Sequence, residues 1–151
     1  MNHPGRTHPQ HNRSAMHDNK PHILVIEDDD FMGALLQFVL ERQHMQVTRV
    51  ADGRAALERI DQGAPVDAVV LDWMLPQVSG LEVLAHLRQH PDWAQRPVLV
   101  LSALDGGSDI ARAFQAGASD YLSKPFHPEE LLARLGHQLA LASGGELVAR
   151  A

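Results

Sequence analysis

Short runs of consecutive apolar residues recur along the chain, and each run stops at a polar residue. Continuous Val, Ile and Leu runs of this length predict strands that are buried on both faces, as in a parallel sheet. The carboxyl ends of parallel strands meet at one edge of the sheet, where α/β proteins bind their ligands. The runs and the residues that follow them are 23–26 before Glu27 and Asp28, 69–71 before Asp72, 98–101 before Ser102, and 121–123 before Lys124 and Pro125.

Segments with helical periodicity separate the predicted strands. In the first of these segments, one face carries Phe31, Leu35, Phe38 and Val39. The predicted strands are 22–26, 45–50, 68–71, 98–101 and 118–122, and the predicted helices are 30–43, 52–60, 79–89, 108–116 and 128–142.

Capping residues mark the ends of several predicted helices. Asp52 is a suitable N-cap, and Ser79 with Glu82 has the spacing of a capping box. Pro128 suits the first position of the last helix. The Ser-Gly-Gly sequence at 143–145 predicts the end of that helix.

The alternation of strands and helices predicts an α/β fold. Its core would be a doubly wound, five-stranded parallel sheet flanked by five helices, with right-handed crossovers. We expect a single domain at 21–142 and a flexible tail at 143–151. Residues 1–20 are rich in His, Asn, Pro and Arg and predict a disordered tail.

Composition narrows the classes of function. The 151 residues include no Cys, which excludes disulfides, thiol catalysis and thiolate metal sites and favours a cytoplasmic location. No apolar run is long enough to span a membrane. The formal net charge is -6, and the first 20 residues are basic on balance, so the remainder is more acidic still. An acidic domain is poorly suited to direct contact with nucleic acid.

Asp72 is the candidate nucleophile, because a carboxylate at the end of a buried strand can form an aspartyl phosphate. The alternative is an Asp that only begins a loop. Acids gathered at one sheet edge repel one another unless a cation lies among them, and Mg²⁺ prefers such oxygen ligands. We expect Asp28 and Asp72 to bind Mg²⁺ directly and Glu27 to act through a water molecule. Asp29 and Asp30 suit the start of a helix.

Lys124 would bring an ammonium group to the same edge. The chain has only one other lysine, Lys20, and the alternative for Lys124 is an ordinary surface position. Pro125 allows a cis peptide bond that would direct the lysine. Ser102 would donate its hydroxyl to phosphoryl oxygens, the alternative being a serine that merely ends a strand. The order of these residues at successive strand ends makes the combination specific.

The segments that contain these residues resemble the receiver domain of bacterial two-component response regulators over residues 22–142. The matching segments are ILVIEDDD at 23–30, LDWMLPQVSG at 71–80, VLSAL at 100–104 and GASDYLSKPF at 117–126. The resemblance implies a flavodoxin-like, CheY-like fold with strand order 2-1-3-4-5.

The resemblance also implies roles for individual residues. Asp72 would accept the phosphoryl group, and Met74 would offer its backbone carbonyl to Mg²⁺. Ser102 would be the switch hydroxyl, and Lys124 would neutralise the phosphoryl oxygens. Tyr121 would turn inward after phosphorylation.

Such a protein takes its phosphoryl group from a sensor histidine kinase or a histidine phosphotransfer protein. It signals to a downstream effector protein through the surface of the fourth helix, the fifth strand and the last helix. We therefore expect a signalling protein and not an enzyme. Asp120, Glu130 and Arg134 resemble residues that bridge phosphorylation-dependent homodimers, solvated surface charges being the alternative. No output domain follows residue 142, which predicts a stand-alone receiver or part of a longer regulator.

Three other classes compete with this interpretation. A haloacid-dehalogenase-type phosphatase also uses a strand-end Asp, but its D-x-D-x-T motif needs a second acid where this chain has Met74. A flavin binder of similar fold would have a Ser/Thr/Gly-rich loop after the first strand, where this chain has acids. A pseudo-receiver that only binds partners would lack phosphorylation residues, and all of them are present here.

Overall fold

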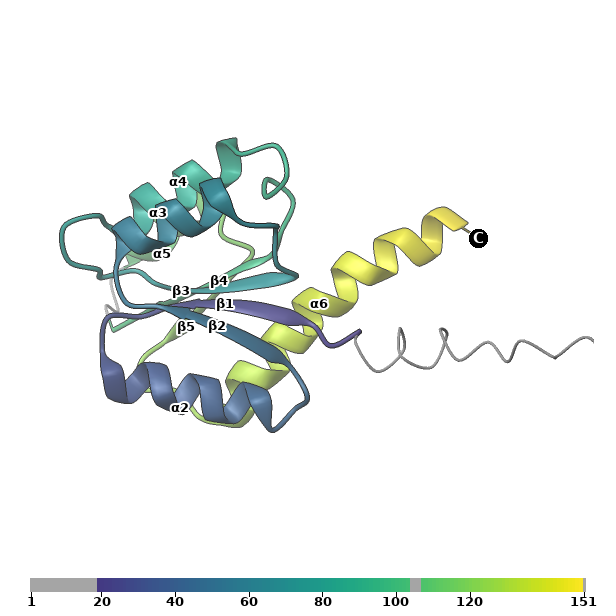
Figure 1. The fold of residues 1–151 in the computed structure, drawn as a ribbon, viewed down its shortest axis with the longest axis horizontal. Helices are drawn as coiled ribbons and strands as arrows, with labels where there is room; N and C mark the ends of the chain where they lie inside the picture. Colours follow the sequence, from purple (N-terminus) through teal and green to yellow (C-terminus); the bar gives the residue numbers. More distant parts are fainter. Residues whose placement is uncertain (1–18, 104–106, 151) are drawn as a thin grey trace, which may run out of the picture.

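The computed structural model describes residues 19–103 and 107–150, apart from the side chains of 145–150. The strands in these residues form one parallel sheet in the order β2-β1-β3-β4-β5, as the resemblance implies (Figure 1). The strands are β1 (His22–Ile26), β2 (Gln46–Val50), β3 (Ala68–Asp72), β4 (Val98–Ser102) and β5 (Asp120–Ser123). The helices are α2 (Asp30–Glu41), α3 (Gly53–Gln62), α4 (Gly80–Gln89), α5 (Gly107–Gln115) and α6 (Pro128–Arg150).

Helices cover both faces of the sheet. Figure 1 shows α3, α4 and α5 on one face and α2 and α6 on the other. Alternate strand residues enter two separate buried clusters: Leu24 and Ile26 belong to one, and Ile23 and Val25 to the other. Because helices cover both faces, the central strands β1, β3 and β4 need apolar residues at consecutive positions, whereas the edge strand β2 is partly exposed. This requirement explains the unbroken apolar runs in the sequence.

The register of the strands places polar residues at one edge of the sheet. Ile26 of β1 pairs with Leu71 of β3, so the next residues, Glu27 and Asp72, lie side by side at the ends of these neighbouring strands. Ser102 is the last residue of β4, and Lys124 comes directly after β5. The chain turns to opposite sides of the sheet after β1 and β3, and ligands of doubly wound sheets bind at such a switch point.

The predicted N-caps Asp52 and Ser79 are confirmed. Asp52 Oδ1 accepts a hydrogen bond from the N–H of Ala55 at 2.7 Å, and Ser79 Oγ accepts one from the N–H of Glu82 at 3.2 Å. Each bond satisfies a backbone donor that the first turn of a helix leaves without a partner. The caps therefore fix where α3 and α4 begin.

The predicted end of α6 is wrong. The helix continues through 143–145 to Arg150, since a helical Gly costs about 1 kcal/mol relative to Ala but removes no backbone hydrogen bond. Figure 1 shows the helix extending beyond the sheet. Residues 1–18 and 151 lie outside the described residues, so the predicted tails there stay predictions. None of the described helices is both long and apolar enough to cross a lipid bilayer.

In α2, the face identified by periodicity is largely in contact with solvent. Phe31 and Phe38 are 78% and 57% exposed. The buried residues of the helix are Gly33, Leu36 and Leu40. Both sets have helical spacing, because α2 is apolar on most of its surface, so periodicity alone does not select the buried face.

Arg88 of α4 joins two loops at the amino-terminal edge of the sheet. Its guanidinium donates to the carbonyl oxygens of Gly117 at 2.7 Å, Ala94 at 3.0 Å and Arg96 at 2.7 Å. The side chain is partly buried and has no acidic partner within 4.0 Å among the described residues. Arg88 therefore satisfies backbone groups and holds the turn after α5 against the loop after α4.

We expect Arg88→Ala to lower the free energy of unfolding by about 3 kcal/mol, because the partly buried carbonyls lose their donors. Urea unfolding followed by far-UV circular dichroism measures the change. Arg112→Ala is the matched control: the side chain is exposed, and we expect a change below about 0.5 kcal/mol. Equal effects of the two substitutions would show that the guanidinium contacts do not stabilise the fold.

Candidate functional site

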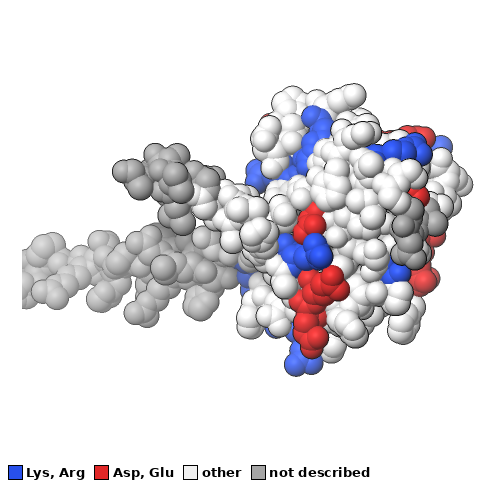
Figure 2. Space-filling view, turned by 180° about the vertical axis from the view of Figure 1, so that it is seen from behind, with Lys and Arg blue, Asp and Glu red and all other residues white. Residues whose placement is uncertain are grey.

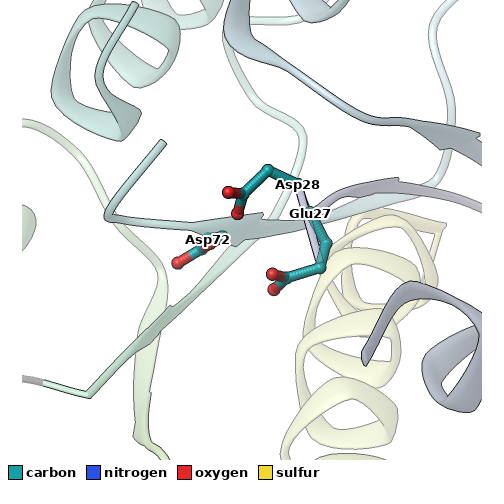
Figure 3. A group of neighbouring side chains, drawn as sticks. All are labelled: Glu27, Asp28 and Asp72. Atoms are coloured by element: carbon teal, nitrogen blue, oxygen red, sulfur yellow. The ribbon is translucent and has the colours of Figure 1, made fainter. Parts of the chain in front are cut away.

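Three carboxylates meet at the carboxyl edge of the sheet (Figure 3). Glu27 and Asp28 directly follow β1, and Asp72 is the last residue of β3. One oxygen of each carboxylate lies within 4.8 Å of one oxygen of the other two. Glu27 and Asp72 are each only 4% exposed, whereas Asp28 is open to solvent. The structure thus brings together the acids that the sequence assigns to one site.

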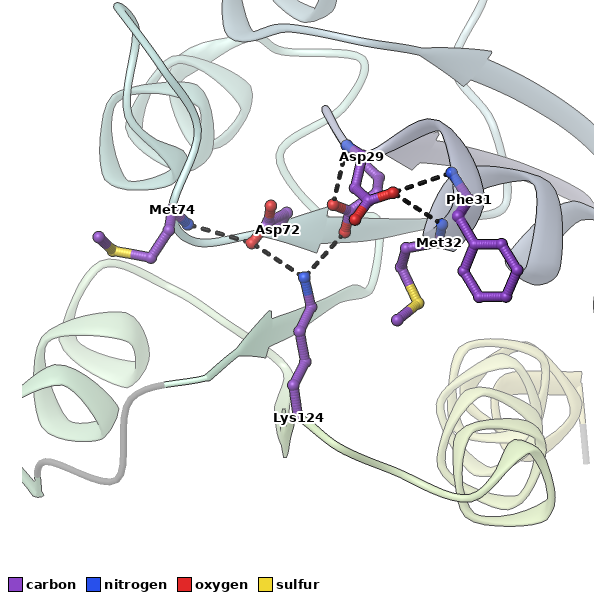
Figure 4. Close-up of polar contacts among 7 residues, drawn as sticks. Asp29, Phe31, Met32, Asp72, Met74 and Lys124 are labelled. Carbon is purple, nitrogen blue, oxygen red and sulfur yellow. Dashed lines mark hydrogen bonds and ion pairs between the residues drawn. The ribbon is translucent and has the colours of Figure 1, made fainter.

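Lys124 brings a positive charge into this cluster. Its Nζ donates a hydrogen bond to Glu27 Oε2 at 3.0 Å and lies 3.5 Å from Asp72 Oδ1 (Figure 4). Its backbone N–H donates to the carbonyl of Ser102 at 2.8 Å, which ties the end of β5 to β4. The Lys124–Pro125 peptide bond is cis, as Pro125 allows. With a side chain that is 20% exposed, Lys124 is not an ordinary surface lysine.

Backbone N–H groups complete the surroundings of two carboxylates. The N–H of Met74 donates to Asp72 Oδ1 at 3.2 Å, and the N–H of Asp29 donates to Glu27 Oε1 at 3.2 Å. Asp29 itself caps α2 through a 2.8 Å bond from the N–H of Phe31 (Figure 4). Asp29 is therefore occupied as a helix cap, in agreement with its expected role.

The electrostatics of the site disfavour a full set of charged carboxylates. Burial raises the pKa of Asp72 from 3.8 to about 7, the charge of Glu27 adds to the increase, and Lys124 opposes it. For Lys124, burial lowers the pKa, but the hydrogen bond to Glu27 and the charge of Asp72 outweigh it, so its pKa is raised overall. The ammonium therefore stays charged at neutral pH, where Asp72 is partly protonated.

The donor set fits a hard divalent cation. Carboxylate oxygens from Glu27, Asp28 and Asp72 converge within 4.8 Å, and a cation near them would relieve the repulsion by Glu27 that adds to the effect of burial on the pKa of Asp72. Mg²⁺ is bound in proteins by one or two carboxylates together with water and phosphate oxygens. The exposed side of the cluster, at Asp28, leaves access for such ligands.

Ser102 and Tyr121 lie on neighbouring strands of the same half of the sheet. Ser102 is fully buried at the end of β4, and Tyr121 is 8% exposed within β5. Ser102 pairs with Ser123 in the strand register, so Tyr121 lies two positions before the level of Ser102. The side chain of Tyr121 belongs to the buried cluster on the face covered by α3, α4 and α5.

The candidate dimer residues also come together, within a single chain. Arg134 Nη1 lies 3.0 Å from Asp120 Oδ1, and Arg134 Nε lies 3.4 Å from Glu130 Oε1. Figure 2 shows that acidic and basic side chains adjoin in a narrow band on the face turned away from the view of Figure 1. A role of these three residues in dimerisation stays a prediction.

Two exposed apolar side chains flank the carboxylates. Phe31, in the first turn of α2, is 78% exposed, and Met74, in the loop after β3, is 59% exposed. From the sequence, only the backbone carbonyl of Met74 is expected at the site, and Phe31 is expected on the apolar face of the first helix. The sequence does contain a signal for Phe31. It is a large aromatic residue directly after a run of four acids, and its helix has more apolar residues than the buried face needs.

Comparison with known proteins shows the family of this chain. The model of the response regulator receiver domain matches residues 23–136. The chain belongs to this family.

Curated relatives of this receiver domain are transcriptional regulators. The phosphate regulon transcriptional regulatory protein PhoB of Rhizobium meliloti is 38% identical over 122 residues, which make up 81% of this chain and 53% of the relative. The transcriptional regulatory protein TcrA of Mycobacterium tuberculosis is 48% identical over 113 residues, 75% of this chain and 44% of the relative. The receiver chain spans about half the length of the curated relatives it matches.

Solved structures agree with the fold of the receiver domain. A Francisella response regulator receiver domain has a TM-score of 0.75 and 32% identity, covering 82% of this chain and 99% of that one. The receiver domain of a sensor histidine kinase from Pseudomonas aeruginosa has a TM-score of 0.74 and 29% identity, covering 80% and 98%. The Pseudomonas structure has a magnesium ion coordinated in its active site cleft.

The raised pKa of Asp72 predicts a pH-dependent stability of the receiver domain in the absence of divalent cations. The pKa rises from 3.8 to about 7 on folding, so this carboxyl group lowers the stability increasingly as pH rises between these values. We expect Asp72→Asn to raise the free energy of unfolding by about 2 kcal/mol at pH 8 and by much less at pH 4.

Urea unfolding in a chelating buffer at both pH values measures this difference. Asp30→Asn removes an exposed charge from the same edge and serves as the control, with an expected change below about 0.5 kcal/mol. A larger gain for Asp72→Asn at pH 4 than at pH 8 would contradict the assigned direction of the shift.

Proposed function

We propose that this chain is a phosphoacceptor receiver in which Asp72 takes a phosphoryl group from a histidine of a sensor kinase or phosphotransfer protein. The observation that carries the proposal is the position of Lys124 Nζ, 3.5 Å from Asp72 Oδ1 inside a cluster of three carboxylates. Phosphoryl transfer depends mainly on positioning and on neutralising charge, and this geometry supplies both.

Asp72 is the nucleophile of the proposed reaction. One carboxylate oxygen attacks the phosphorus of the donor phosphohistidine, and a P–O bond forms as the P–N bond breaks. The imidazole of the donor leaves with the electron pair of the broken bond. The N–H of Met74, which donates to Asp72 Oδ1 at 3.2 Å, holds the carboxylate in place. Lys124 presents its ammonium to the phosphoryl oxygens.

Magnesium ion is the proposed cofactor. Asp28 and Asp72 are the side chains that would hold it, together with the carbonyl of Met74, and when bound it neutralises negative charge on the transferring phosphoryl group. The convergent oxygen donors support this assignment. The magnesium-bound receiver domain of the Pseudomonas kinase, with 29% identity, gives further support.

Ser102 and Tyr121 are the proposed switch residues. The phosphoryl group would draw the hydroxyl of Ser102 towards Asp72 and stabilise the buried position of Tyr121, which is 8% exposed. Tyr121 lies in β5, between α5 and α6 in the chain, so its position affects the surface that these elements share. An effector protein that prefers one arrangement of this surface would then respond to phosphorylation.

The exposed side chains around the acids form the proposed contact surface for the protein donor. The donor histidine must come within bonding distance of Asp72, so the donor has to cover the rim of the site. Phe31 and Met74, 78% and 59% exposed, flank this position from two different segments. Exposed aromatic residues at a contact centre contribute strongly to protein association.

Asp72→Asn tests the proposed chemistry. With Mg²⁺ and acetyl phosphate, we expect the wild-type chain to gain the mass of one phosphoryl group and to change its Trp emission, because the buried Trp73 follows Asp72 directly. The Asn variant should show neither donor-dependent effect. Asp30→Asn, which alters a neighbouring acid, should be phosphorylated like the wild type. A wild-type chain that gains no phosphoryl group from either acetyl phosphate or a histidine donor would refute the function.

Phe31→Ala tests the contact surface. We expect it to slow transfer from a histidine-phosphorylated donor protein by roughly fivefold or more, since the donor loses an apolar contact. The rate with acetyl phosphate should stay within about twofold, because a small donor does not need that contact. Phe38→Ala, on the same face but farther from the acids, is the control and should have the smaller effect. Equal slowing with both kinds of donor would exclude a docking role.

A further inference from the structure

The β3–α4 loop (residues 73–79) has to keep one conformation for the site to keep its geometry. Its Met74 N–H donates to Asp72 Oδ1 at 3.2 Å. Farther along the loop, Gln77 has a φ of 66°, which is a costly backbone conformation for a residue with a side chain. Such a conformation persists only where its surroundings hold it. Because Gln77 is exposed, the restraint has to come from other contacts of the loop.

The start of α3 supplies one of these contacts. Gly53 is the first residue of α3, and a Cβ atom at this position would lie 2.4 Å from the carbonyl oxygen of Val78 and 2.6 Å from its Cβ. Both distances are well inside the roughly 3.5–4.0 Å of an ordinary contact between carbon atoms. Val78 therefore occupies the space that a side chain at position 53 would need. Figure 1 shows α3 and α4 on the same face of the sheet, with the loop leading into α4.

The other contacts of the loop lie within its own β/α unit. Leu75 is buried in the apolar cluster beneath α3 and α4. Gly80, the first residue of α4, donates its N–H to the carbonyl of Trp73 at 3.2 Å and packs directly on the backbone there. Gly53 belongs to the preceding unit, so its contact fixes the loop against a separate part of the fold.

We propose that Gly53 is a positioning residue, which leaves room for Val78 and so lets α3 hold the loop with the Met74 N–H on Asp72. The inference rests on the proposed function for its purpose, because the orientation of Asp72 matters for phosphoryl transfer only if this residue is the phosphoacceptor. A Cβ at position 53 would push the Val78 backbone away from α3. Since the loop is short and joined to rigid elements at both ends, the displacement would pass along it to Met74.

Gly53→Ala adds this Cβ atom, and amide hydrogen exchange reports the result. NMR on the full chain, without any phosphodonor, gives the exchange rates of the Met74 and Gly80 N–H groups. We expect both rates to rise by roughly fivefold or more, since their hydrogen bonds depend on the conformation of the loop. The N–H of Lys124, which donates to the carbonyl of Ser102 at 2.8 Å, is the internal reference and should change by less than about twofold.

Gly107→Ala is the matched control. Gly107 is the first residue of α5, and apart from its chain neighbours no atom of the described residues lies within 4 Å of its Cβ position. This substitution should leave the exchange rates of the loop unchanged. Val78→Ala removes methyl groups that face Gly53 and adds no atom. It should raise the loop rates by roughly threefold or more, and it provides the second test if Gly53→Ala does not fold.

Phosphorylation by acetyl phosphate at saturating Mg²⁺ links the loop to the reaction. We expect Gly53→Ala to react more slowly than the wild type by roughly fivefold or more, because small displacements of reacting groups are costly in rate. Gly107→Ala should react like the wild type. If Gly53 served only the stability of α3, the substitution would speed exchange at Lys124 as much as in the loop.

A rise of the loop rates below about fivefold in folded Gly53→Ala, or an equal rise at Lys124, would overturn the proposal. If that variant does not fold, a rise below about threefold in Val78→Ala overturns it. Faster loop exchange with an unchanged rate of phosphorylation would also overturn it. If the wild-type chain accepts no phosphoryl group, the proposed function fails, and the exchange rates still decide whether Gly53 holds the loop.

Discussion

Repulsion between carboxylates at the carboxyl edge of the sheet is the constraint on which the site depends. Glu27 and Asp72 are almost completely buried and lie beside Asp28, and Lys124 is the cation in contact with them among the described residues. One ammonium does not balance three carboxylates in a medium that screens charge poorly. Burial of Asp72 and the nearby charge of Glu27 together raise the pKa of Asp72. A site in this state gains from binding a cation, which is the property that the proposed phosphoryl transfer to Asp72 requires.

The rest of the fold supplies the rigidity that holds these charges close together. Two buried apolar clusters, one on each face of the sheet, hold the strands in place. Backbone hydrogen bonds from Glu27 to Val50 and from Lys124 to Ser102 hold the ends of β1 and β5 against their neighbours. Without this support the acids would separate and become hydrated, because solvation of each charge is favourable. The stability of the two apolar clusters therefore opposes the electrostatic cost of the site.

The surface formed by α5, β5 and α6 differs electrostatically from the carboxylate cluster, because its charged residues Asp120, Glu130 and Arg134 are paired. Arg134 is already paired with Asp120 and Glu130 inside the chain, at 3.0 and 3.4 Å. Association through these residues would exchange ion pairs within a chain for ion pairs between chains, which changes the free energy little when the groups are exposed. Any preference of this face for a partner therefore depends on the packing of its apolar groups, such as the partly exposed Phe114. Packing is also the property that the proposed switch of Tyr121 would alter.

Much of this protein was determined by local sequence. Unbroken apolar runs predicted the central strands β1, β3 and β4, because strands covered on both faces need apolar residues at consecutive positions. Asp52 and Ser79 predicted helix starts because capping acts within one turn. Tertiary structure alone decided which face of α2 is buried, since several apolar stripes on that helix satisfy the same spacing. It also decided that Lys124 contacts Glu27, because residues 97 positions apart meet only when the strand order brings their ends together.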